Sequence, residues 1–568
     1  MTTVYTRRRH KPERASGVPS LKSKGVEANS APSKEELSEP AWRVASVLIL
    51  AVATILRVYH LQLVPLHHDE GVNGNFLVRL VREGFYHYDP ANYHGPTLYY
   101  FSAMIPWILR FLFGPSAQNT YGLNTVTIRL VPALFGVATI YLLLLLRRSL
   151  GTIATLSAAA LLAISPGAVY LSRYFIHETL FIFFTLGVVV AGLNYFKDGN
   201  PLYLLLAAIS AALLFATKET AIISAGVLVI ALATTHIYRW LRRSSIHLRS
   251  KQSARSARQE LRTVLAAFTE RAGGPRALAL WGLSALVVFI AVSILFYSSL
   301  FTNFPKGVYD AFKTFQFWRK TGSEAHVHPY YTYFKWLLNE ESPLLFFGSL
   351  GAAYLVGRPR NSFALFSALW AFGLLVAYSL IRYKTPWLTL NFLLPLALVG
   401  GYSLQRIHQV FRGDLRLLGA IALLTVAVSG YQTVDLNFFN YDNDDEYYVY
   451  VYAHTRRETL KLVEEIGRQA KRAPEGNSIG ITIVSPDYWP LPWYLRDYPH
   501  VGYHGHMVDS KEQLIVASEG QGAEMQAQFG KRYEQIKSGF NSAGSYPLRP
   551  GVSLLLYVRR IPEAGPEL

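Results

Sequence analysis

The 568-residue sequence contains no cysteine, which excludes disulfide bonds and thiol chemistry. Charged residues are also scarce, at 16%, whereas 51% of the residues are hydrophobic and the mean hydropathy is +0.20. This balance suits a membrane protein that crosses the bilayer several times better than it suits a soluble protein. Functional residues are therefore expected in the short segments in which ionisable residues gather.

The net charge of +18 would suggest a nucleic-acid partner in a soluble protein. Here the basic residues flank apolar segments. Residues 1–40 carry eight Lys/Arg with five Glu, and residues 239–277 carry ten Lys/Arg with two Glu. The positive-inside rule explains both as cytoplasmic, with membrane lipids as their partners. We therefore expect no nucleic-acid partner, and we expect residues 1–40 to be a disordered cytoplasmic tail.

Apolar runs dominate residues 41–431. A spanning helix needs about 20 mostly apolar residues, and about eleven segments meet or approach that length. They are residues 41–58, 126–146, 150–171, 175–196, 202–217, 220–238, 278–301, 343–357, 363–381, 386–403 and 414–431. Segment 97–113 is apolar but contains Pro106 and Arg110. We expect it to lie along the membrane or to re-enter it.

The placement of arginine and lysine predicts the orientation of these spans. Arg147 and the basic loop 239–277 should be cytoplasmic. Counting spans from these points places the loops 59–125 and 302–342, and everything from 432 to 568, on the extracytoplasmic face. The predicted location is the cell (plasma or inner) membrane, as a multi-pass protein with its site outside.

The last part of the chain, residues 432–568, changes character. A helical pattern with charged faces covers 455–472, and strand-like runs follow at 479–484, 513–518 and 552–558. Such alternation is typical of a small α/β domain. The predicted fold class is therefore an α-helical polytopic membrane protein, residues 41–431, with a small extracytoplasmic α/β C-terminal domain.

Ionisable residues gather in the loops that the charge rule places on the outer face. They are His67, His68, Asp69, Glu70, Asp89 and His94 in the first loop; Arg173, His177 and Glu178 in the second; Lys218 and Glu219 in the third; and His326, His328, Arg382 and Lys384 later on. A site at the membrane surface requires such convergence of separate loops on one face.

Four of these residues are consecutive: His67, His68, Asp69 and Glu70. They either end a helix in water or form a site, because ionisable residues at a membrane boundary are a functional-site hypothesis. Neighbouring carboxylates can divide the work, one accepting a proton while the other orients a ligand or cation. Imidazole and carboxylate also suit Zn²⁺ or Mn²⁺. Adjacent histidines on a loop cannot easily reach the same ion. A metal site and a metal-free site in which the carboxylates act alone are therefore both open alternatives.

Four cations stand at the expected outer boundary: Arg129, Arg173, Arg382 and Lys384. Snorkelling and anchoring at the membrane interface explain such residues without any ligand. Arginine and lysine are also the usual partners of phosphate, and Arg129 could alternatively pair with Asp69 or Glu70. Glu178 either makes a surface pair with Arg173 or belongs to a second acidic turn that faces the first. Together these residues indicate an enzyme that acts on a lipid-linked phosphate.

Several motifs carry a resemblance to a known family. They are Asp69-Glu70, Gly95-Pro96-Thr97-Leu98-Tyr99-Tyr100, Arg129-Leu130-Val131-Pro132-Ala133-Leu134, Ser172-Arg173-Tyr174 through His177-Glu178, and Thr217-Lys218-Glu219. In these motifs, residues 41–240 resemble the GT-C superfamily of polytopic glycosyltransferases, in its protein mannosyltransferase and aminoarabinose-transferase-like branch. The stretch from Arg382 to Trp387 and the tail look similar to a subgroup catalogued as flippase-activity-associated proteins of glycosylation.

The resemblance implies transfer of a sugar from a polyprenyl-phosphate donor to a glycan, lipid or protein acceptor on the extracytoplasmic face, with inversion. It implies that Asp69 is the general base, that Glu70 supports it, and that His177 and Glu178 form the second acidic loop. The cations that it implies for the donor phosphate are Arg129, Arg173, Arg382 and Lys384. A divalent metal ion (Mg²⁺, Mn²⁺ or Zn²⁺) on Asp69, Glu178 and His68 is a further hypothesis.

Two other classes of function stay open from the residues alone. A flippase would need a polar path at mid-depth in the membrane, whereas the ionisable groups here collect at one face. A non-catalytic, flippase-associated or scaffold component of a lipid-linked glycan pathway would tolerate a degenerate site. The presence of Asp69, Glu70 and Glu178 argues against degeneracy.

Overall fold

The computed structural model describes residues 37–92, 94–114, 122–246, 266, 268–324, 326–411 and 414–560. From Leu37 onward these residues cluster as one compact unit. Most of the predicted tail lies outside the described residues. Helix α1 (Glu39–Val58) begins just after Ser38, whose hydroxyl accepts a hydrogen bond from the Ala41 N–H. The last two residues of the predicted tail therefore belong to this helix.

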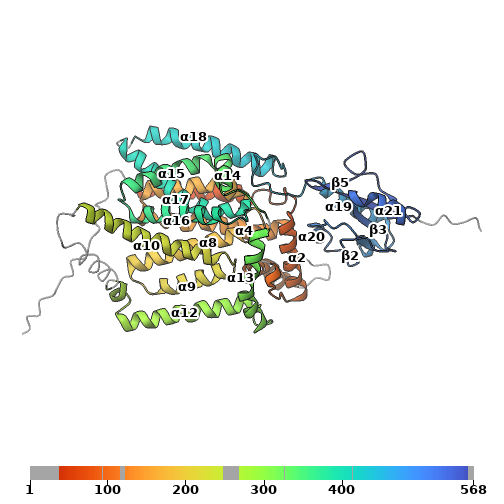
Figure 1. Ribbon diagram of the computed structural model, residues 1–568, viewed down its shortest axis with the longest axis horizontal. Coiled ribbons are helices and arrows are strands. Elements are labelled where there is room, and N and C mark those ends of the chain that lie inside the picture. The colour runs from red at the N-terminus through yellow and green to blue at the C-terminus, as the bar shows by residue number, and fades with distance from the viewer. Residues whose placement is uncertain are drawn as a thin grey trace, which may run out of the picture. The chain divides into compact units, whose positions relative to one another are not determined.

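Eight helices in the described part of the chain are long and apolar enough to cross a membrane. They are α1, α4 (Thr125–Leu144), α8 (Glu178–Asp198), α10 (Ala221–Ile246), α12 (Pro275–Tyr297), α16 (Ser362–Leu380), α17 (Leu390–Val410) and α18 (Leu415–Val434). In Figure 1 the long helices run side by side. A ninth span results if α6 (Thr152–Ala163) and α7 (Pro166–Ser172), bent by 61°, count as one.

The remaining two predicted spans are α9 (Leu202–Phe215) and α15 (Ser342–Gly357). They have 14 and 16 residues, fewer than the about 20 that a straight span needs. Every predicted apolar segment thus coincides with a helix or a bent pair of helices, and the predicted polytopic α-helical class is confirmed.

The break between α6 and α7 has a local cause. Pro166 cannot continue a helix from within, and the Ser165 hydroxyl caps the new one. The last carbonyls of α6 would be left without partners there. Arg57, buried on α1, donates to the carbonyls of Leu162 and Ala163, each at 3.0 Å. A buried arginine thus stabilises the bend.

Short helices fill the two long loops predicted for the outer face. The first loop contains α2 (His68–Glu83) and α3 (Thr97–Phe113); the second contains α13 (Lys306–Glu324) and α14 (Thr332–Glu340). Figure 1 shows α2 and α13 crosswise to the long helices. Helix α3, predicted to lie along the membrane or to re-enter it, has 17 residues.

The C-terminal part forms a mixed six-stranded sheet with helices α19 (Thr459–Arg472), α20 (Leu491–Tyr494) and α21 (Gly522–Phe529). The strand order is β2-β1-β3-β6-β4, with β5 also paired to β6. The strands are β1 (Ile481–Ile483), β2 (Val501–Tyr503), β3 (Leu514–Ser518), β4 (Tyr533–Gln535), β5 (Tyr546–Arg549) and β6 (Val552–Arg559). The sequence predicted β1, β3 and β6 but missed the other three, which have only three or four residues.

Helix α20 packs directly on α2. A Cβ added to Gly71 would lie 2.6 Å from Cβ of Pro490, and one added to Gly74 would lie 2.6 Å from Cε3 of Trp493. No larger side chain fits without a shift, so two glycines allow the close approach. The α/β part is thereby held against the helix that carries Asp69.

Candidate active site

Asp69 and Glu70 lie in the first turn of α2, and their side chains have opposite environments. The ring Nδ1 of His67 accepts a hydrogen bond from the Asp69 N–H at 3.1 Å, and Glu70 Oε2 accepts one from the His67 N–H at 3.0 Å. This reciprocal capping fixes the start of the helix. The side chain of Asp69 is 43% exposed, whereas that of Glu70 is 0% exposed. Of the two predicted catalytic carboxylates, Asp69 is thus partly exposed and Glu70 is fully buried.

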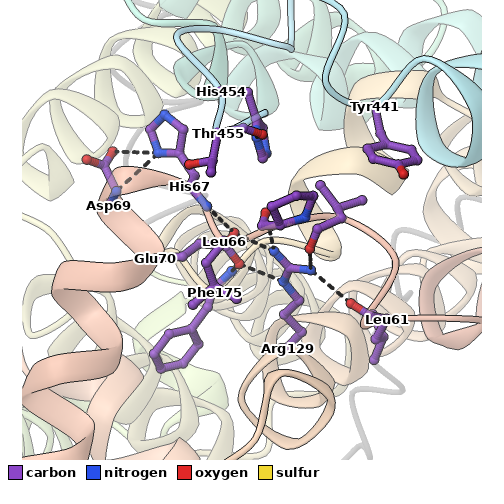
Figure 2. Close-up of polar contacts among 12 residues, drawn as sticks. Leu61, Leu66, His67, Asp69, Glu70, Arg129, Phe175, Tyr441, His454 and Thr455 are labelled. Atoms are coloured by element: carbon purple, nitrogen blue, oxygen red, sulfur yellow. Dashed lines mark hydrogen bonds and ion pairs between the residues drawn. The ribbon is translucent and has the colours of Figure 1, made fainter. Parts of the chain in front are cut away.

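The Glu70 carboxylate forms a buried bidentate ion pair with Arg129. Oε1 accepts from Nε of Arg129 at 2.7 Å, and Oε2 accepts from Nη2 at 2.6 Å (Figure 2). Oε1 also accepts from the Phe175 N–H at 2.8 Å. With the bond from His67, this carboxylate receives four hydrogen bonds and joins α2, α4 and the turn before α8. Such saturation suits a residue that positions others.

Arg129 and Arg173 both donate to backbone carbonyls of residues 56–65. Arg129 donates to Leu61 at 2.8 Å, Val64 at 2.7 Å and Pro65 at 3.2 Å. Arg173 donates to Leu56 at 3.1 Å, Tyr59 at 2.6 Å and His60 at 3.1 Å. Both side chains are buried, and burial lowers the pKa of Arg173 to about 10. Their hydrogen bonds favour a role in holding the end of α1 and the following loop rather than in binding phosphate.

A cage of rings surrounds His67. Its Nε2–H donates to the Tyr452 carbonyl at 3.1 Å, which leaves Nδ1 free to accept from Asp69. The rings of His454 and Trp387 lie 5.5 Å and 6.0 Å from that of His67. Burial lowers the pKa of His454 to about 3, so this ring is neutral. Tyr452 and His454 were missed from sequence, because nothing in their local pattern indicates a contact 385 residues away.

Five buried or half-buried residues form a second group, here called the inner polar cluster: His94, His177, Glu178, Lys218 and Glu219. Glu178 and Lys218 are buried and ion-paired. Nδ1 of His94 lies 3.2 Å from Oε2 of Glu219, and the rings of His94 and His177 are 5.1 Å apart. Burial first, and then the nearby His94 and Lys218, keep the pKa of His177 well below its usual value. The predicted second acidic loop, with His177 and Glu178, thus lies beside the loop that carries Lys218 and Glu219.

The backbone at Gly95 locks this cluster together. The Gly95 N–H donates to the Thr217 carbonyl at 3.0 Å, and His177 Nε2 donates to the Gly95 carbonyl at 2.9 Å. A Cβ on Gly95 would lie 2.0 Å from the Ala216 carbonyl oxygen. Only glycine permits this approach, which explains one glycine of the Gly95-Pro96-Thr97 motif.

A cavity of about 400 Å³ lies at the turn after α16. Arg382 and Lys384 line it together with His328, and the other lining residues are Val327, Pro329, Tyr330, Ser379 and Leu380. Lys384 is buried and donates to the Ile381 carbonyl, and burial lowers its pKa. Two of the four predicted phosphate-binding cations, Arg382 and Lys384, thus line this cavity.

Tyr383 connects the two acidic positions. Burial raises its pKa, and the Asp69 and Glu178 carboxylates, in that order, raise it further. The antiparallel bridge between Val327 and Tyr383 holds this turn against the second outer loop. The Tyr383 phenol is therefore within electrostatic range of both the Asp69 and the Glu178 carboxylates.

The predicted metal ligands are Asp69, Glu178 and His68. No group of three or more His, Asp or Glu residues suited to a metal ion occurs in the part of the chain that the structure describes. Glu178 is neutralised by Lys218. Asp69 Oδ2 lies 3.9 Å from Nδ1 of His67, not against His68.

His68 instead faces the C-terminal α/β part. Its ring lies 6.0 Å from that of Trp489, and its Nδ1 is 3.5 Å from Nη1 of Arg549, which is ion-paired with Asp487. Burial is the largest cause of the lowered pKa of His68. No local pattern around these three C-terminal residues predicts that they lie beside the first loop.

Part of the chain matches a known protein family. Residues 102–251 match the family model described as dolichyl-phosphate-mannose-protein mannosyltransferase. This segment covers α4, α6 to α10 and most of α3. No curated protein matches the sequence.

The structure is similar to that of ArnT from Cupriavidus metallidurans bound to undecaprenyl phosphate. The TM-score is 0.58 at 14% identity, covering 91% of this chain and 98% of that one. It is also similar to the archaeal oligosaccharyltransferase AglB from Archaeoglobus fulgidus in complex with an inhibitory peptide and a dolichol-phosphate. Here the TM-score is 0.51 at 14% identity, covering 85% of this chain and 70% of that one. The predicted GT-C fold is confirmed, and the predicted enzyme class agrees with these matches.

Proposed function

We propose that this protein is a membrane glycosyltransferase that transfers a sugar from a polyprenyl-phosphate donor to an acceptor hydroxyl, with Asp69 as the general base. One observation carries the proposal: Asp69 keeps a partly exposed carboxylate beside Glu70, whose own carboxylate is buried and saturated. The rigid pair of Glu70 and Arg129 fixes the helix start, so that the neighbouring carboxylate is presented in one direction. Preorganisation of this kind is what a catalytic base requires.

The reaction follows from this placement. Asp69 takes the proton of the acceptor hydroxyl, whose oxygen attacks the anomeric carbon of the donor. The bond between that carbon and the phosphate oxygen breaks, the polyprenyl phosphate leaves with the electron pair, and the configuration inverts. No acid is needed for such a leaving group, so cations that offset its developing charge supply the remaining stabilisation.

Arg382 and Lys384 are the cations that we assign to the donor phosphate. They line the cavity after α16 with His328, whose pKa is lowered by burial and then by His326 and Lys384. Guanidinium and ammonium groups are strong partners for phosphate oxygens. We assign Arg129 and Arg173 to positioning, because their hydrogen bonds go to Glu70 and to backbone carbonyls.

The lipid class and the sidedness belong to the same proposal. The ArnT and AglB structures contain undecaprenyl phosphate and dolichol-phosphate; we extend that class of lipid to this donor. The positive-inside rule favours an extracytoplasmic site, with residues 41–431 as the catalytic membrane domain and residues 432–568 outside. A glycan, lipid or protein acceptor would reach Asp69 between α2 and the α/β domain.

The test is sugar transfer, or donor hydrolysis, by purified protein given a panel of polyprenyl-phosphate sugars. Wild type is compared with Asp69→Asn, with and without a chelator. Turnover that disappears in Asp69→Asn supports the proposal, and we expect the chelator to leave turnover unchanged. Donor binding without turnover for any sugar would overturn it in favour of a non-catalytic component of a lipid-linked glycan pathway.

A further inference from the structure

Two acceptor atoms of the inner polar cluster are buried without a hydrogen-bond partner among the described residues. They are Oε1 of Glu219 and Nδ1 of His177. Nearly all buried polar atoms in proteins are satisfied, so each exception requires an explanation. Leaving a buried acceptor unpaired costs free energy that a bound hydrogen-bond donor would recover.

The contacts of the neighbouring atoms show that both orphans are acceptors. His177 Nε2 lies 2.9 Å from the Gly95 carbonyl, which can only accept, so Nε2 carries the hydrogen and Nδ1 offers its lone pair. Glu219 Oε2 already faces His94 at 3.2 Å. Both buried atoms can therefore accept a hydrogen bond from an O–H or N–H donor.

The surrounding charges disfavour a metal ion at this point. The Lys218 ammonium belongs to the cluster and is ion-paired with Glu178. A fixed cation beside His177 repels a second, divalent one. Although His94 and Glu178 are neighbours, no group of three or more His, Asp or Glu residues suited to a metal ion occurs among the described residues. A neutral ligand that carries several hydroxyl groups meets the same acceptors without this repulsion.

The cluster is close to the base through α2. Asn73 follows Asp69 by one helical turn, on the same face. Its Oδ1 accepts from the Tyr99 hydroxyl at 2.8 Å, and the Tyr99 ring lies 5.5 Å from that of His177. Burial raises the pKa of Tyr383, and the carboxylates of Asp69, Glu178 and Glu219 raise it further. Acceptors lined by aromatic rings are the usual surroundings of a bound sugar ring.

We propose that Glu219 and His177 accept hydrogen bonds from the hydroxyl groups of the donor's sugar, and so determine which sugar is transferred. This inference rests on the proposed function, since it places the sugar between the Asp69 base and the phosphate cavity. The pair of Glu178 and Lys218 then sets the charge balance around the subsite, and His94 orients Glu219.

The test separates the sugar from its lipid carrier. The binding of a short-chain polyprenyl phosphate is measured beside that of the same lipid carrying a hexose or a pentose, and of its mono-deoxy analogues. Wild type is compared with Glu219→Gln, which keeps the size and one acceptor. The matched control is Glu446→Gln, because the Glu446 side chain is 90% exposed on the surface.

Wild type should bind the glycosylated lipid more tightly than the bare lipid, and should discriminate against one deoxy analogue by roughly 10- to 100-fold, as expected for hydrogen bonds to a charged group. Glu219→Gln should lose most of that discrimination while binding the bare lipid as wild type does. Equal discrimination in wild type and Glu219→Gln would overturn the proposal, as would sugar binding that a chelator abolishes.

A second variant keeps the outcome decisive if Glu219→Gln folds poorly. His177→Gln retains an N–H for the Gly95 carbonyl but removes the free ring acceptor, so it should lose discrimination at a hydroxyl too. If wild type discriminates between the sugars but shows no turnover, the proposed function is contradicted and the sugar subsite still stands. If wild type shows turnover but both variants discriminate between the sugars as wild type does, the proposed function stands and the sugar subsite is contradicted.

Discussion

The carboxylate of Glu70 and the guanidinium of Arg129 meet in two hydrogen bonds of 2.7 Å and 2.6 Å, with both side chains at most 1% exposed. The two residues are 59 positions apart in the sequence, and their ion pair ties α2 to the membrane-spanning helix α4. The side chain of Asp69, the residue before Glu70, stays partly exposed. Two adjacent acidic residues therefore do different work, and each can be tested alone.

Asp69→Asn should leave a folded protein with little transfer activity. A positioned general base contributes roughly 10²–10⁴-fold, and asparagine cannot take a proton. The measurement is kcat for sugar transfer, with thermal unfolding in detergent as the check on folding. Near-normal kcat with an unchanged melting curve would remove Asp69 from the role of base.

Glu70→Gln should instead lower stability. Removing one partner of a buried ion pair leaves the other charge uncompensated and typically costs about 3–5 kcal/mol. We expect Glu70→Gln to have a lower melting temperature than wild type. Any change in its kcat has to be read together with that loss of stability. Glu446→Gln, at an exposed position, is the matched control and should melt as wild type does. A Glu70→Gln protein as stable as the control would contradict the positioning role.

Lys384→Ala and Arg382→Ala should weaken donor binding. Hydrogen bonds to charged groups contribute about 1.5–3 kcal/mol, so each loss should raise the KM for the donor roughly 10- to 100-fold. Lys335→Ala is the control, because Lys335 is half exposed and pairs with Glu446. An unchanged donor KM in both cavity variants would show that the phosphate binds elsewhere.

Glu341 predicts a pH dependence of stability. It accepts hydrogen bonds from the Ser165 hydroxyl and the Gly167 N–H, each at 2.8 Å, and burial raises its pKa from the usual 4.5 to about 7. The folded state thus binds this proton more tightly than the unfolded one, so stability falls as pH rises from 4.5 to 7 and is level above.

Glu341→Gln removes that titration and keeps an acceptor for both donors. Its unfolding free energy should fall less steeply than that of wild type between pH 4.5 and 7, by an amount on the order of 3 kcal/mol across the window. Melting curves at several pH values measure it. Parallel pH profiles for the two proteins would show that the carboxyl does not titrate in this range.

The helices were accessible from the sequence because their causes are local. Apolar runs predicted each span, and Ser165-Pro166 explains why the segment 150–171 became the bent pair α6 and α7. Strands β2, β4 and β5 were missed because each has only three or four residues and, unlike β1, none lies in an apolar run such as Ile-Gly-Ile-Thr-Ile-Val at 479–484.

In the candidate site, too, some features are local in the sequence and others depend on tertiary packing. The residue types, the loops that carry them and the family motifs can all be read along the chain, since spacing along one helix or turn is a local property. Folding is what turns Glu70 inward to Arg129 while Asp69 stays exposed, directs Arg173 to backbone carbonyls, and lines a cavity with Arg382 and Lys384. The physical reason is that burial and hydrogen-bond partners depend on segments packed from distant parts of the chain, and no local pattern specifies which donor meets which acceptor.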